Sequence, residues 1–312
     1  MKQLSNTAQK IKNMEIRGAG RIARAAAAGL RNYSQRIGTG KLEEFNTKMI
    51  EAAQILISTR PTAVSLPNAV RAVMRYKGDS VDEAKANIKE LADGFILNSE
   101  SAVLKIGEIG AHRIRDGDTI MTHCNSSAAI SIMAAAHKDG KNISVIATES
   151  RPRWQGHLTI RQLDETGIKT SLIVDSSVRY FMKEVYLVVM GADAFTANGS
   201  VINKIGTSQL ALAAHEARKN VIIAAETYKF SPKSLLGELI EIEERNSSEV
   251  IADEKLREFS NVSVKNPAFD VTPREYIDLI CTEVGAIPPE MAYIIIKEYL
   301  GWGLGDMDQG LK

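Results

Sequence analysis

The stretch DGDTIMTHCNSSAAISIMAAAHKDGKNISVIATES, residues 116–150, decides the fold of this 312-residue chain. Each of its ends holds a short apolar run typical of a buried strand, and its middle spaces apolar residues three and four apart, as a helix does. A strand, a helix and a second strand in this order predict two parallel strands joined by a crossover helix. The first strand ends at Cys124, and the helix starts near Ser126 and Ser127.

The same alternation continues toward the C-terminus. Three more apolar runs, TSLIVDS, VYLVVMGAD and NVIIAAE, begin at residues 170, 185 and 220, and amphipathic segments such as SQLALAAHEARKN lie between them. Nearly continuous apolar strands are typical of a parallel sheet that helices cover on both faces. We therefore predict a doubly wound, Rossmann-like α/β catalytic domain over residues 116–312.

Residues 1–115 show a different pattern. Segments such as GRIARAAAAGLRNYSQRI and KLEEFNTKMIEAAQILIS space their apolar residues as helices do, and no convincing strand interrupts them. Glycines and prolines punctuate these helices. The first part of the chain is therefore predicted to be an N-terminal helical domain over residues 1–115.

Charge and cysteine usage exclude several classes of function. A formal net charge of +1 gives no overall field toward nucleic acid or membrane, so we expect neither as a partner. The N-terminus has no apolar signal core, and no apolar run approaches the length of a membrane span. Two cysteines in a chain of this length make no disulfide framework, which favours a reducing, cytoplasmic location. We interpret Cys281, in the apolar run YIDLICTEVG, as a core residue.

The carboxyl ends of parallel strands are where open α/β sheets bind ligands. Cys124 lies at one such end, next to a helix start whose free N–H groups could bind an anion and lower the pKa of the thiol. Asp193, which ends the run VVMGAD, could act as a general acid or base. The alternatives are a small buried cysteine and an aspartate that caps a turn. The histidines show no metal-ligand spacing and no nucleotide-binding glycine motif is present, so no metal or cofactor is expected.

Several cations precede helix starts or follow strands, where they could bind phosphate. Arg17-Gly18-Ala19-Gly20 combines a cation with a glycine turn, and Asn203-Lys204 leads into a helix. Arg151 could bind phosphate with two hydrogen bonds or pair with Glu149. Solvated surface is the alternative for each cation alone. The acidic stretch EIEERNSSEV, residues 241–250, is interpreted as a solvated loop or helix end.

Seven ordered segments together resemble one superfamily. It comprises the regulatory subunits of translation initiation factor 2B, the methylthioribose-1-phosphate isomerases and the archaeal ribose-1,5-bisphosphate isomerases, and the resemblance is strongest to the last group. The resemblance covers nearly the whole chain. The segments are KNMEIRGAGRIARAAA, TRPTAVSLPNAVR, IMTHCNSSAAISIM, ATESRPRWQG, VVMGADAFTANGSVINKIGT, AAETYKFSP and VKNPAFDVTP.

This resemblance implies an isomerase that converts ribose 1,5-bisphosphate to ribulose 1,5-bisphosphate in archaeal AMP salvage, upstream of a carboxylase. Cys124 would accept a proton and Asp193 would donate one. It also implies a homohexamer built as a trimer of dimers, and AMP as a possible activator. A methylthioribose-1-phosphate isomerase and an initiation factor 2B-like regulatory subunit remain the alternatives. The candidate substrate-binding residues are Arg17, Gly18, Ala19, Gly20, Arg60, Ser126, Ser127, Ala128, Arg151, Asn203, Lys204 and Lys229.

Two further expectations follow from this assignment. Members of the group carry a lysine where this chain has Ser127, so a phosphate at that position would have to rely on backbone N–H groups of the helix start. Because Arg17 and Arg60 belong to the helical half, we expect the substrate to lie between the two domains, where closure could exclude water.

Overall fold

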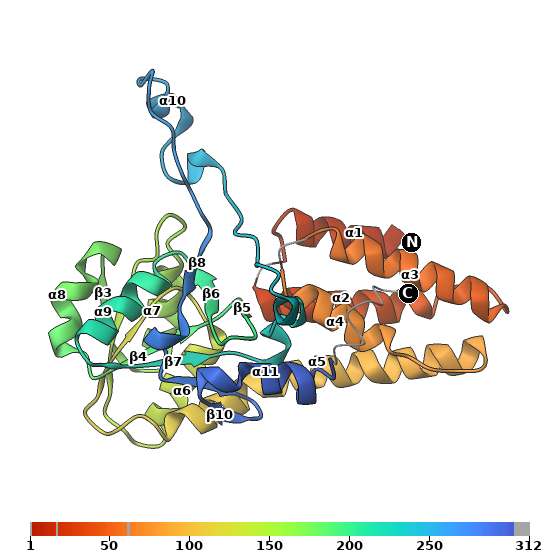
Figure 1. Cartoon of the computed structure of the whole chain (residues 1–312), viewed down its shortest axis with the longest axis horizontal. Coiled ribbons are helices and arrows are strands. Elements are labelled where there is room, and N and C mark those ends of the chain that lie inside the picture. Colours follow the sequence, from red (N-terminus) through yellow and green to blue (C-terminus); the bar gives the residue numbers. More distant parts are fainter. Residues whose placement is uncertain (1, 17, 61–62, 303–312) are drawn as a thin grey trace.

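The computed structural model describes residues 2–16, 18–60 and 63–302 of the chain (Figure 1). Before Thr119 the described residues form helices and no strand, as the sequence predicts. Apolar residues at helical spacing, among them Ala26, Leu30 and Leu56, form one core between these helices. The helices are α1 (Lys2–Lys12), α2 (Ala19–Ser34), α3 (Leu42–Ile57), α4 (Ser65–Met74) and α5 (Val81–Ala111).

The longest helix, α5, joins the helical region to the sheet and runs beneath both in Figure 1. Ser80 caps it by accepting a hydrogen bond from the backbone N–H of Glu83. Its first turns place Ile88 in the helical core, and its last turns place Ile106 in a core below the sheet. The predicted division into domains at residue 115 stays a prediction, because this helix contributes to the cores of both parts. Across the described ranges, no helix combines the length and apolar character needed to cross a membrane.

A seven-stranded sheet forms the second part of the molecule. Its strand order is β10-β9-β7-β4-β1-β2-β3. Neighbouring strands are parallel, except that β10 runs antiparallel to β9. The strands are β1 (Thr119–Thr122), β2 (Ser144–Thr148), β3 (Lys169–Ile173), β4 (Leu187–Gly191), β7 (Asn220–Ala224), β9 (Leu279–Thr282) and β10 (Gly285–Ile287).

Successive residues of the central strands enter two different cores. Ile120 and Val189 belong to the core that α5 and α6 cover, whereas Met121 and Val188 belong to the core under α8 and α9. This alternation follows from the two-residue period of a strand, and it explains why the runs read as continuously apolar. The doubly wound architecture is therefore confirmed. The helices after β1 include α6 (Ser127–Lys138), α7 (Gln155–Glu165), α8 (Val178–Phe181) and α9 (Thr207–Glu216).

The structure adds strands that the sequence analysis misses. Cys281 is fully buried, which confirms it as a core residue, but its segment is strand β9, which pairs in parallel with β7. A separate antiparallel sheet has the order β5-β6-β8. Its strands are β5 (Ala194–Phe195), β6 (Val201–Lys204) and β8 (Phe269–Thr272).

A long excursion, residues 237–265, leaves the body of the molecule before β8; we call it the arm. It carries α10 (Asp253–Leu256) at its far end and projects away from the sheet (Figure 1). Apolar side chains of the arm, including Leu239, Phe259 and Val262, are exposed. Its first residues lie beside the sheet and the helical region, where Ile240, Glu241 and Arg245 form part of the site described next.

Candidate active site

The two predicted catalytic residues follow adjacent strands in the middle of the sheet. Cys124 comes after β1 and Asp193 after β4, and these two strands pair in parallel. From β1 the chain moves outward through β2 and β3, whereas from β4 it moves in the opposite direction through β7 and β9. The strand order therefore reverses between β1 and β4. Open α/β sheets bind ligands beyond the carboxyl ends of their strands at such a reversal.

The backbone of Cys124 is held in an uncommon conformation. Its φ of +65° lies in the left-handed region, which few residues other than glycine adopt. Its N–H donates a hydrogen bond of 2.7 Å to Ser150 Oγ, and its carbonyl accepts one of 2.6 Å from Thr159 Oγ1. Strained backbone persists only where its surroundings hold it, and such positions cluster at functional sites.

The helix that follows Cys124 starts close to the end of β4. Ser126 caps α6 by accepting a hydrogen bond from the N–H of Ala129. Gly191, the last residue of β4, makes this approach possible. A Cβ atom at Gly191 would lie 2.3 Å from Ser126 Oγ. A glycine at this position therefore lets the start of α6 pack against the end of β4.

The expected lowering of the Cys124 pKa is wrong. Burial raises the pKa of this thiol to about 11, while the charge of Lys204 opposes that rise and Asp193 adds to it. The helix start lowers the pKa of Cys124 by less than desolvation raises it, because a buried thiolate loses more hydration energy than it gains from nearby dipoles. The thiol is therefore protonated near neutral pH.

Lys204 and His123 complete the polar surroundings of the thiol. Lys204 is 5% exposed, and its Nζ donates to the carbonyl of Ala268 at 3.0 Å. Burial lowers the pKa of Lys204, whereas the charges of Cys124 and Asp193 raise it. His123 hydrogen-bonds Thr148 through Nδ1, and burial lowers its pKa, so it is a neutral part of the strand end.

A cavity of about 830 Å³ opens beside these residues, between the helical region and the sheet. Both parts of the chain line it, as expected for a substrate bound between them. Among the described residues, eight cationic side chains and five carboxylates line this cavity. The predicted residues that line it are Gly18, Ala19, Gly20, Arg60, Cys124, Ser126, Ser127, Ala128, Asp193, Asn203, Lys204 and Lys229.

The predicted glycine turn lies at the first residues of α2. Gly18 is the N-cap, with a φ of +86°, and Ala19 begins the helix. The N–H groups of this 16-residue helix start and the positive end of its dipole suit an anion. Arg17 lies outside the described residues, so its predicted role stays a prediction.

Lys229 reaches the cavity with a carboxylate partner that the sequence analysis does not anticipate. Its Nζ lies 2.7 Å from Glu226 Oε2, and the Tyr228 hydroxyl donates to Glu226 Oε1 at 2.9 Å. Lys229 and Glu226 are both almost fully buried. A Cβ at Gly20 would meet the Tyr228 hydroxyl at 2.9 Å, so this glycine lets α2 approach the group.

Arg151 takes a different position from the one predicted. It does not line the cavity, and none of its described side-chain contacts is with Glu149. Its predicted contact with phosphate stays a prediction. Its guanidinium lies 4.6 Å from the centre of the Trp154 ring and donates to the carbonyl of Val250 on the arm. The turn that follows β2 directs Arg153, and not Arg151, to the cavity.

Several residues of the cavity wall are missed by the sequence analysis. Arg245 is the clearest case, because the acidic stretch 241–250 predicts a solvated loop or helix end, yet the Arg245 side chain is only 11% exposed. Its position depends on contacts between the arm and distant segments, which no local pattern encodes. Other residues missed at the wall are Arg153, Gln155, Arg161 and Glu226.

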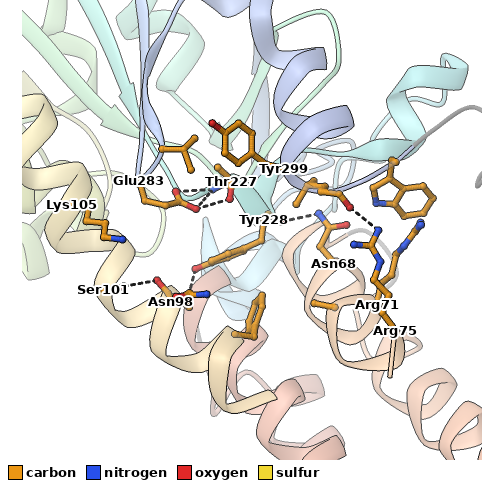
Figure 2. Close-up of a pocket in the computed structure, with 16 residues that line it drawn as sticks. Asn68, Arg71, Arg75, Asn98, Ser101, Lys105, Thr227, Tyr228, Glu283 and Tyr299 are labelled. Carbon is orange, nitrogen blue, oxygen red and sulfur yellow. Dashed lines mark hydrogen bonds between the residues drawn. The ribbon is translucent and has the colours of Figure 1, made fainter. Parts of the chain in front are cut away.

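A second cavity, of about 400 Å³, is lined by Thr227 and Tyr228, which belong to the same short helix as Lys229 (Figure 2). Thr227 and Glu283 form one wall, and the Thr227 N–H donates to Glu283 Oε2 at 3.0 Å. On another wall Arg71 lies 3.1 Å from the centre of the Trp302 ring. Tyr228 lines this cavity while its hydroxyl contacts Glu226 of the first one.

Comparison with known proteins agrees with this geometry. The sequence profile described as the Initiation factor 2 subunit family matches residues 15–289. The chain belongs to this family. It is 59% identical to the ribose 1,5-bisphosphate isomerase of Archaeoglobus fulgidus, over 97% of this chain and 95% of the relative. It is 56% identical to the enzyme of the same name from Methanocaldococcus jannaschii, over 96% of both chains.

Solved structures of this family share the fold. The crystal structure of the translation initiation factor eIF-2B of Pyrococcus horikoshii superposes with a TM-score of 0.79 at 31% identity. The match covers 93% of this chain and 98% of that structure. The same architecture therefore occurs in proteins named as enzymes and as initiation factors. The residues at the site must decide between these functions.

Proposed function

We propose that this chain is a ribose 1,5-bisphosphate isomerase, which interconverts ribose 1,5-bisphosphate and ribulose 1,5-bisphosphate. One observation carries the proposal: Cys124 and Asp193 line the same cavity from the two strands at which the sheet order reverses. An aldose–ketose isomerisation needs an acid and a base at adjacent carbons. A purely regulatory subunit has no need of such a pair.

The charges of the cavity support a substrate with two phosphates. Each phosphate carries about −1.5 to −2 charges at neutral pH. The cations come from several separate segments, including the turn at Arg60, the strand end at Lys204 and the arm at Arg245. A sugar with one phosphate would leave part of this positive charge uncompensated. The bisphosphate therefore fits this cavity better than methylthioribose 1-phosphate does.

The reaction requires four proton movements. The ring oxygen gains a proton as its bond to C1 breaks, C2 loses a proton, C1 gains one, and the C2 hydroxyl loses one. Asp193 serves the two oxygens, first as donor to the ring oxygen and then as acceptor. Cys124 takes the proton from C2 and returns it to C1. No atom is lost, so the product is an isomer of the substrate.

The raised pKa of Cys124 shapes the start of this cycle. A thiol with a pKa of about 11 is ionised in about one molecule in ten thousand at pH 7. Transfer of the thiol proton to the Asp193 carboxylate creates the base and the donor in a single step. It also keeps the net charge of the cavity constant, which avoids adding a buried charge.

Further properties of the group extend the proposal to the whole enzyme. We expect a cytoplasmic homohexamer, assembled as a trimer of dimers, that acts on a small sugar bisphosphate and is activated by AMP. The exposed apolar residues of the arm, such as Leu239 and Phe259, support assembly, because such side chains gain by burial in an interface. Light scattering coupled to gel filtration measures the assembly.

The decisive experiment incubates the purified protein with ribose 1,5-bisphosphate, with and without AMP. A coupled carboxylase reports the ribulose 1,5-bisphosphate that forms. Methylthioribose 1-phosphate is tested in parallel. Cys124→Ser should reduce turnover at least a hundredfold, on the scale of about 1.4 kcal/mol per factor of ten, while the melting temperature is retained. Faster turnover of methylthioribose 1-phosphate than of the bisphosphate would refute the proposed substrate.

A further inference from the structure

Arg245 is a mostly buried cation at the cavity that none of the motifs singles out. It lies where the arm leaves the body, and its backbone N–H donates to the carbonyl of Asn266 at 2.9 Å. Its side chain is 11% exposed and lines the cavity that Cys124 and Asp193 share. Few arginines are buried to this extent without a specific partner.

The hydrogen bonding of this guanidinium is incomplete. Its Nε lies 3.6 Å from Glu243 Oε1, and one terminal nitrogen lies 3.8 Å from Glu249 Oε1. Both distances exceed that of a hydrogen bond. The buried Nε makes no hydrogen bond with any described residue, and the same is true of Glu249 Oε2. A guanidinium offers five donors in a planar fork, so the geometry suits a bidentate anion better than these two carboxylates.

The two carboxylates are shared with other arginines of the cavity wall. Glu243 Oε2 lies 3.0 Å from an Arg60 nitrogen, and Glu249 Oε1 lies 2.8 Å from Arg153 Nη1. Three arginines from three distant segments thus share two carboxylates. Glu243 and Glu249 satisfy Arg60 and Arg153 at hydrogen-bond distance and leave Arg245 with the two long contacts.

Arg245 is also close to the reacting groups. Its charge lowers the pKa of Lys204, which Cys124 and Asp193 raise. Lys204, Cys124, Asp193 and Arg245 all line the same cavity. An anion bound to Arg245 would therefore lie within reach of the catalytic pair, at the side of the cavity that the arm forms.

We propose that Arg245 binds one phosphate group of the substrate, and that this phosphate replaces Glu243 and Glu249 as the partner of its guanidinium. This inference rests on the proposed bisphosphate substrate. The two carboxylates then act as internal competitors of that phosphate. They keep the arginine folded against the cavity, and they weaken binding by the energy needed to displace them.

The test compares three variants of the full-length protein. Arg245→Gln should raise the KM for ribose 1,5-bisphosphate about tenfold or more with a smaller effect on kcat, because a charge-assisted contact is lost. Glu249→Gln should lower the KM, about threefold, because one competitor is removed. Arg257→Gln removes the same charge from an exposed position of the arm, and its KM should equal that of the wild type.

A purely structural role predicts a different pattern. If Arg245 only ties the arm to the body, Arg245→Gln and Glu249→Gln both loosen the same contact and should raise the KM together. That outcome would overturn the inference. An unchanged KM in Arg245→Gln would overturn it as well. Melting temperatures identify a variant that fails to fold. If Arg245→Gln does not fold, the direction of the change in KM in Glu249→Gln still distinguishes the two roles.

Inorganic phosphate separates this inference from the proposed function. Calorimetric titration measures its binding without any turnover. Weaker phosphate binding by Arg245→Gln than by Arg257→Gln supports the phosphate site. This result stands even if the wild type fails to isomerise the bisphosphate, a failure that would refute the proposed function alone. The opposite outcome is also possible: the wild type isomerises the bisphosphate, but Arg245→Gln and Arg257→Gln have the same KM and the same affinity for phosphate. That outcome would refute the phosphate site and leave the proposed function intact.

Discussion

The reactivity of Cys124 toward iodoacetamide should rise steeply with pH and stay low at neutrality. Only the thiolate reacts. With a pKa of about 11 the thiolate fraction at pH 7 is about 300 times smaller than for a free cysteine, whose pKa is about 8.5. A more basic thiolate is the stronger nucleophile, which returns roughly a factor of ten. The alkylation rate at pH 7 should therefore be about thirtyfold below that of a free cysteine.

The assay follows alkylation of the Cys124 peptide by mass spectrometry between pH 7 and pH 10, in a Cys281→Ala background that leaves one thiol. The slope of the rate against pH carries the information, because it does not depend on the absolute accessibility of the thiol. The rate should increase about tenfold per pH unit over this range, because the pKa lies above it. A rate that levels off below pH 9 would refute the reasoning that burial outweighs the helix start.

Two variants test the sign of the neighbouring charges. Lys204 lowers the pKa of Cys124 and Asp193 raises it. Lys204→Met should therefore slow alkylation at a given pH, and Asp193→Asn should accelerate it. The same direction of change in both variants would point to altered access in place of electrostatics, and would contradict the proposed arrangement of charges.

Three other perturbations have expected outcomes. Asp193→Asn should reduce kcat in the coupled assay about a hundredfold or more, and a rate above about a tenth of wild type would rule out the donor role. Gly191→Ala should lower the melting temperature, since the new methyl would lie 2.3 Å from Ser126 Oγ and overpacking costs about 1–3 kcal/mol; an unchanged value would contradict the close approach. Glu226→Gln should destabilise the protein in urea by about 3–5 kcal/mol, because Lys229 would be buried without a counter-charge, whereas a loss below about 1 kcal/mol would show that the pair is solvated.

The parts of the fold that the sequence predicts are those whose environment is uniform along the element. The central strands are buried on both faces, so their residues are apolar without interruption, as in the run that contains Val188 and Val189. Strand β6 lacks such an uninterrupted apolar run, because two of its buried residues, Asn203 and Lys204, are polar and line the cavity. Strand β10 is short and lies at the edge of the sheet. Local pattern carries little signal for strands of these two kinds.

The residues of the site also fall into those that local sequence pattern predicts and those that it does not. The location of Cys124 and Asp193 at the cavity can be predicted, because the carboxyl ends of parallel strands can be recognised in the sequence. Their catalytic roles stay predictions. The position of Arg245 cannot be predicted in this way, because its burial depends on Glu243 meeting Arg60, a contact across 183 residues of sequence. The direction of the Cys124 pKa shift is likewise hidden in the sequence, which shows the helix start but not the burial that raises this pKa.

The position of Lys229 depends on the helical region as much as on the sheet. The side chain of Asn68, in α4, donates to the carbonyls of Tyr228 and Phe230, and Ser99, in α5, hydrogen-bonds the Tyr228 hydroxyl. Because that hydroxyl also binds the carboxylate that pairs with Lys229, a shift of the helices relative to the sheet would move this cation. The sheet alone positions Cys124 and Asp193. The cavity itself requires both parts of the chain, which is why the cations that line it are so widely spaced in the sequence.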